Sequence, residues 1–69
     1  MRFDNPVIFF EKVLVDTGKA VLVYDHLNER DCWIPKFYSG GRPMIEVEEL
    51  TKGVEITMPE WLAIEKELV

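Results

Sequence analysis

The chain has few of the side chains on which catalysis, cofactor binding and cross-linking depend. Its 69 residues include one cysteine, one histidine and four glycines. A single cysteine cannot form a disulfide within the chain, which favours a reducing compartment. The glycines form no P-loop, no Gly-x-Gly-x-x-Gly motif and no Gly-x-Ser-x-Gly motif. The nucleotide-binding and hydrolase sites that need those loops are therefore excluded.

Long apolar runs are also missing. No stretch approaches the roughly 18 apolar residues that a membrane-spanning helix needs. The stretch MRFDNPVIFF has no basic segment followed by a long apolar one, so we expect no signal peptide. These absences predict a cytoplasmic protein.

Basic side chains are outnumbered, and the imbalance lies at one end of the chain. Eight Lys and Arg face 13 Asp and Glu, for a net charge of −5. Up to residue 43, six acidic residues balance six basic ones; residues 44–69 hold the other seven acidic residues and two lysines, which gives −5. Non-specific nucleic-acid binding needs basic residues to neutralise phosphates, so this charge favours a basic protein as the partner.

The composition that remains is typical of a small folded chain. Hydrophobic residues make up 48% and charged residues 30%, which indicates a globular rather than a disordered protein. We expect a single domain over residues 1–69, close to the lower size limit for an unaided core. Because oligomerisation adds buried area, a homodimer is one option.

Strand patterns dominate until residue 58, where the period changes. The predicted strands cover residues 7–15, 20–25, 31–35, 44–50 and 54–58. Residues 59–69 have an apolar face at helical spacing, with Pro59 suited to the first helical position. This order predicts an α+β fold: a small curled antiparallel sheet of four or five strands, an SH3-like or OB-like barrel, with one C-terminal helix. The expected core residues are Val13, Val15, Val21, Val23, Trp33, Ile56 and Trp61.

Two side chains carry potential nucleophilic chemistry, His26 in a predicted turn and Cys32 in the following strand. No third group is placed to orient them, and two ligands fall short of the four of a structural zinc site. We therefore expect no enzymatic activity, no catalytic residue, no metal and no cofactor.

The acidic end supplies a candidate partner-binding surface. Glu46 and Glu48 share one face of a predicted strand, and Glu55 lies on the exposed face of the next. Their mutual repulsion would be relieved by a basic partner. The alternative is a solvated face that serves solubility and discourages edge pairing. The candidate partner-binding residues are Glu46, Glu48, Glu49 and Glu55.

The stretch DCWIPKFYSGGR (31–42) interleaves aromatic and basic residues. Exposed aromatic rings stack on bases while cations meet phosphates, as in single-stranded nucleic-acid sites. The other interpretations are a core Trp33 with a partly covered rim, and a protein-binding patch. The candidate nucleic-acid-binding residues are Trp33, Lys36, Phe37, Tyr38 and Arg42.

Three segments together resemble a group of short proteins encoded by phages, prophages and plasmids. They are KAVLVYD (19–25), CWIPK (32–36) and PEWLAIEKEL (59–68). The group has the pattern Lys-Ala-x-Leu-Val, then Trp-[Ile/Leu]-Pro-Lys, then Pro-Glu-Trp-Leu-Ala-x-Glu-Lys. The resemblance implies a mobile-element origin and no particular mechanism. By analogy with small acidic phage proteins, it suggests an accessory module that occupies a host protein, including nucleic-acid-binding defence machinery such as CRISPR effectors.

Overall fold

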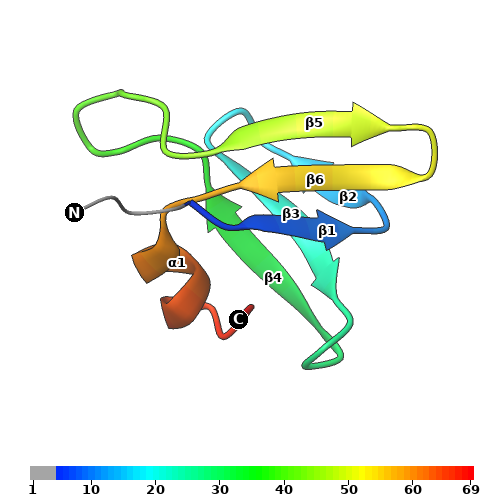
Figure 1. Ribbon diagram of the computed structural model, residues 1–69. Coiled ribbons are helices and arrows are strands. Elements are labelled where there is room, and N and C mark those ends of the chain that lie inside the picture. Colours follow the sequence, from blue (N-terminus) through cyan, green and yellow to red (C-terminus); the bar gives the residue numbers. More distant parts are fainter. Residues whose placement is uncertain (1–4) are drawn as a thin grey trace.

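The computed structural model describes residues 5–69. Arg2 and Asp4, which enter the charge balance, and the first residues of the stretch considered for a signal peptide lie outside the described residues. The described chain forms a small, mostly β fold with one short C-terminal helix (Figure 1). Its elements are β1 (Val7–Phe10), β2 (Val13–Asp16), β3 (Ala20–Asp25), β4 (Arg30–Pro35), β5 (Glu46–Leu50), β6 (Gly53–Thr57) and α1 (Glu60–Glu65).

The strands form two antiparallel three-stranded sheets. Sheet A has the order β1-β6-β5 and sheet B the order β2-β3-β4. The strand predicted over residues 7–15 is divided, because the exposed pair Glu11 and Lys12 interrupts its apolar run. β1 therefore pairs within sheet A and β2 within sheet B, and the described residues hold six strands rather than four or five.

The inner faces of both sheets meet in one hydrophobic core. Val21, Val23 and Ile56 are buried as predicted, and Val13 packs against the core from the side. The full set of buried apolar residues is Phe10, Val21, Val23, Cys32, Ile34, Ile45, Val54, Ile56, Met58, Leu62, Ala63 and Leu68. The helix thus contributes to the same core as the two sheets.

Three of the predicted core residues are exposed, so those predictions are wrong. Val15 is exposed, and Trp33 keeps 46% of its surface accessible. Trp33 lies between the buried Cys32 and Ile34, and the alternation of a strand turns it outward. Trp61 is 50% exposed because α1 instead presents its neighbour Leu62 to the core.

The helix is shorter than the three turns that the sequence predicts. Pro59 precedes it in an extended conformation, and its carbonyl accepts hydrogen bonds from the N–H groups of Leu62 and Ala63. After α1, Glu67 has a φ of 59°. This left-handed residue ends the helix and returns Leu68 to the core, where its N–H donates to the Ala63 carbonyl at 2.8 Å. Within residues 5–69, no helix has the length and apolar character needed to cross a membrane.

Candidate partner-binding surfaces

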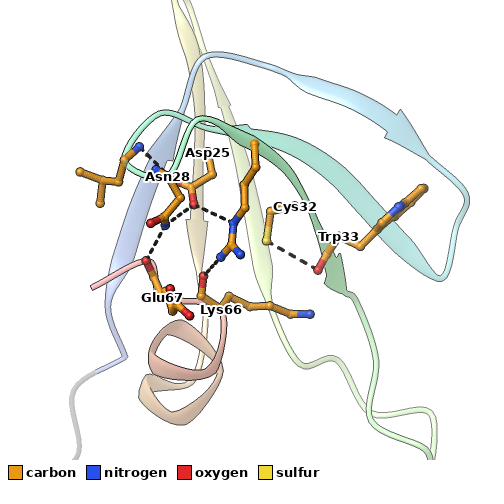
Figure 2. A network of polar contacts seen from close by, with 8 residues as sticks. Asp25, Asn28, Cys32, Trp33, Lys66 and Glu67 are labelled. Atoms are coloured by element: carbon orange, nitrogen blue, oxygen red, sulfur yellow. Dashed lines mark hydrogen bonds and ion pairs between the residues drawn. The ribbon is translucent and has the colours of Figure 1, made fainter.

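A buried carboxylate organises the turn between β3 and β4 (Figure 2). Asp25 is 2% exposed, and its Oδ1 accepts hydrogen bonds from the N–H groups of Leu27 at 3.0 Å and Asn28 at 3.4 Å. Its Oδ2 accepts a bond from Asn28 Nδ2 at 2.6 Å and pairs with Arg30 Nε at 3.5 Å. Burial acts to raise the pKa of Asp25, but the hydrogen bonds and the Arg30 charge outweigh it, so the pKa lies below its ordinary value.

The same turn is tied to the end of the helix. Asn28 Nδ2 also donates to the carbonyl of Glu67 at 3.0 Å, and Arg30 Nη2 donates to the carbonyl of Lys66 at 2.5 Å (Figure 2). Carbonyls at a helix C-terminus have no partner inside the helix, so these side chains satisfy them. The network therefore holds sheet B against the C-terminal segment.

Cys32 lies in β4, whereas His26 lies in the turn that follows β3. Cys32 is on the inner face, and burial raises the pKa of its thiol, which disfavours the reactive thiolate. His26 contacts the ring of Tyr24 edge-on at 5.0 Å between centroids, and its Nε2 lies 3.3 Å from Glu11 Oε1. Tyr24 precedes the inward Asp25, so it faces outward. Among residues 5–69 no three His, Cys, Asp or Glu side chains are grouped as metal ligands.

Three of the four candidate carboxylates come together on the outer face of sheet A. The strand register places Glu48 opposite Glu55, and Glu55 opposite Phe9. In the next row Glu46 lies opposite Thr57, which pairs with Val7. We call this surface the acidic face; it comprises Val7, Phe9, Glu46, Glu48, Leu50 and Glu55.

Phe9 is the largest apolar side chain of the acidic face, and it is 53% exposed. Its ring covers Gly53, since a Cβ on that residue would lie 2.6 Å from Phe9 Cε1 and Cζ. Gly53 also has a φ of 145°, a region that favours glycine. The tight β5–β6 hairpin therefore leaves room for the ring to lie on the sheet. Sequence reasoning missed Phe9, because VIFF (7–10) is apolar throughout and no polar residue marks its outer side.

The fourth carboxylate, Glu49, is separated from the others. It alternates with Glu48 and therefore lies on the inner side of β5 together with Val47. There it lines a cleft of about 380 Å³ between β5 and sheet B. The residues of this cleft are Val13, Asp16, Val21, Lys36, Val47 and Glu49.

An ion pair lies at this cleft. Lys36 Nζ is 3.1 Å from Asp16 Oδ1 and 3.2 Å from Oδ2, and the N–H of Gly18 donates to Oδ1 at 2.8 Å. The bond from Gly18 and the Lys36 ammonium hold the pKa of Asp16 below its ordinary value. Lys36 is thus engaged within the chain.

The nucleic-acid candidates are only partly brought together. Trp33 lies on the outer face of sheet B opposite Leu22, which in turn pairs with Val15, and in Figure 2 its side chain extends away from α1. Phe37, four residues on, is also exposed.

The other candidates of this set are directed elsewhere. Lys36 turns to the cleft, while Tyr38 is half-buried with the Arg42 guanidinium 5.3 Å from its ring centroid. The structure therefore presents two exposed aromatic side chains, Trp33 and Phe37, without the lysine that lies between them in the sequence.

No family model, no curated protein and no solved structure matches this chain.

Proposed function

We propose that this chain is a non-enzymatic protein-binding module that uses its acidic face to bind a basic surface. The observation that carries the proposal is the direct cross-strand pairing of Glu48 with Glu55, beside an exposed Phe9. Like charges that face one another across a sheet are destabilising. A partner with Lys or Arg side chains relieves this repulsion and gains an apolar contact with Phe9.

The two kinds of side chain have different roles in such a surface. Phe9 and Val7, on β1 at one side of the acidic face, supply the apolar area of the contact, and large apolar anchors of this kind contribute much of the binding energy of an interface. The carboxylates Glu46, Glu48 and Glu55 raise the association rate and select basic partners. Salt screens that selection over ~8–10 Å, so binding weakens as the ionic strength rises.

The resemblance to phage, prophage and plasmid proteins suggests the biological setting. In this proposal the chain is a cytoplasmic accessory protein that inhibits a host protein, with a nucleic-acid groove of defence machinery as the basic surface. We further propose that the two sheets together form a small SH3-like or OB-like barrel. It is supported by the continuous path from β1 into β2, which links the two sheets.

The test is capture of proteins from host lysate, treated with nuclease, on the immobilised chain. The variant reverses Glu46, Glu48 and Glu55 to Lys, and a matched control reverses the exposed Glu29, Asp31 and Glu65 to Lys. Both variants change the net charge equally. We expect the acidic-face variant to lose the captured protein and the control to retain it. Equal capture by the two variants, with the fold intact, would show that the acidic face is only a solvated surface.

A second candidate function is single-stranded nucleic-acid binding through Trp33 and Phe37. It is supported by the exposure of both rings, whereas the pairing of Lys36 with Asp16 opposes it. A titration of fluorescently labelled oligothymidylate, followed by fluorescence anisotropy, separates the two functions. If the alternative is correct, Trp33→Ala abolishes binding and Trp61→Ala leaves it unchanged. We expect no binding to either variant or to the parent chain.

A further inference from the structure

β5 is an edge strand whose outer side carries no other strand of the described chain. In the order β1-β6-β5 it pairs with β6 alone, and all five of its residues are exposed. In Figure 1 it forms one border of the sheet. The backbone N–H and C=O groups that point away from β6 are therefore available to an added strand.

The cleft lies directly beside this edge. Val47 projects into it from β5, and Val13 and Val21 form its apolar wall on sheet B. Glu49 lies in the same cleft, near the Lys36–Asp16 pair. A chain placed alongside β5 would thus have the cleft, with its apolar wall of Val13, Val21 and Val47, on one side and the carboxylates of the acidic face on the other.

We propose that β5 is a strand-addition site for an extended partner segment in which apolar and basic residues alternate. The proposal rests on the proposed function and names the kind of partner. Successive side chains of a strand point to opposite faces. The apolar side chains of the segment therefore enter the cleft against Val47, while its basic side chains meet Glu46 and Glu48. The main-chain bonds supply affinity, and the two faces select the sequence.

Charge argues against a second copy of this chain as the occupant. Two β5 strands joined edge to edge would bring Glu46, Glu48 and Glu49 of one copy alongside the same three residues of the other. Like charges on neighbouring strands are destabilising, and the whole chain carries a net charge of −5. A segment in which apolar and basic residues alternate avoids this repulsion, because its basic side chains lie opposite Glu46 and Glu48 and its apolar side chains lie against Val47 in the cleft.

The probe is a short synthetic peptide in which Lys and Val alternate, added to the ¹⁵N-labelled chain. Amide hydrogen exchange is measured along β5. We expect exchange to slow by about tenfold or more at the alternate β5 amides that point away from β6, because those groups gain partners. A block peptide of the same composition, with all Lys before all Val, provides the matched control and leaves exchange unchanged.

A variant tests the cleft separately. Val47→Ser removes an apolar contact inside the cleft while keeping the strand, and we expect the alternating peptide to bind about threefold to tenfold more weakly. Circular dichroism checks that the variant keeps its fold. The inference is overturned if the alternating peptide does not bind, or if it binds without slowing exchange at any β5 amide.

These outcomes are distinct from failure of the proposed function. Lysate capture that depends on the acidic face, without slowed exchange in β5, leaves a protein-binding surface and removes strand addition. Slowed exchange in β5 that persists when Glu46, Glu48 and Glu55 are reversed to Lys also overturns the inference, because the basic side chains of the segment would then have no role.

Discussion

The two sheets bury similar inner faces and differ on their outer faces. Sheet A presents three carboxylates to one side of Phe9, whereas the middle row of sheet B is apolar, with Val15, Leu22 and Trp33. Both inner faces are constrained by the shared core. The outer faces are not constrained by the core. Their different chemistry therefore makes them the candidate functional surfaces.

The sheets also differ in how their ends are secured. Sheet B is fastened to the C-terminal segment through Asn28 and Arg30, with Asp25 holding both side chains. In sheet A, β5 ends the strand order. The hydrogen bonds of Asn28 and Arg30 make sheet B and the C-terminal segment a rigid unit. An unpaired edge strand such as β5 is a place where another chain can pair.

The largest expected effect tests whether both sheets belong to one core closed by α1. Leu62 is 2% exposed, whereas its neighbour Trp61 is 50% exposed. We expect Leu62→Ala to lower the free energy of unfolding by about 2–5 kcal/mol, the cost of emptying a buried leucine site. Trp61→Ala serves as the matched control and should cost less than about 1 kcal/mol, because an exposed side chain leaves no cavity. Urea denaturation measures both values.

Urea denaturation of Leu62→Ala can also contradict the view that the two sheets share one core. If Leu62→Ala melts sheet B and leaves sheet A folded, separate probes on the two sheets report different midpoints. The two inner faces would then not form one cooperative core.

A smaller effect is expected at Asp25, which holds the side chains that tie sheet B to the C-terminal segment. In Asp25→Asn the new amide group cannot accept from Asn28 Nδ2 and pair with Arg30 as the carboxylate does. We expect a loss of about 1–3 kcal/mol at neutral pH. The exposed Asp16, whose pKa is also lowered, provides the control Asp16→Asn with a smaller loss.

The pH dependence of stability follows from the lowered pKa of Asp25. A carboxylate whose pKa is lower in the folded chain contributes fully above the ordinary value of 3.8, and that contribution is lost as the pH falls through the folded pKa. Below pH 3.8 the melting temperature of Asp25→Asn should therefore fall less steeply with decreasing pH than that of the parent chain. Parallel acid profiles for the two chains would show that Asp25 does not hold the turn.

Local pattern predicted that strands precede one final helix, but not the division of residues 7–15 into β1 and β2, nor the direction of every side chain. Trp33 lies in a run of apolar residues, and only the packing of Cys32 and Ile34 against the core decides that it turns outward. Trp61 and Leu62 are adjacent apolar residues, so the phase of a short helix depends on what it packs against. The hydrogen bond from Asn28 to the Glu67 carbonyl joins residues 39 positions apart in the sequence, so no local pattern predicts it.

The candidate site was predictable to the extent that it depends on alternation. Glu46, Glu48 and Glu55 share a face because strand period and the β5–β6 hairpin place them there. Glu49 was expected to act with them, yet the same alternation sends it to the cleft. Phe9 required knowledge of which sheet β1 joins, since that pairing sets its ring over Gly53.

The smallest expected effect concerns the repulsion that underlies the proposed function. Glu48→Gln removes one member of the facing pair with Glu55, and we expect the free energy of unfolding to rise by about 0.2–1 kcal/mol at low salt. The gain should shrink as salt is added, because screening already weakens the repulsion in the parent chain. Glu49→Gln, one residue away but facing the cleft beside Lys36, is the matched control and should give no gain. Equal responses of the two variants would mean that overall charge, rather than the Glu48–Glu55 pair, sets the cost, and the acidic face would then have no stored repulsion for a partner to relieve.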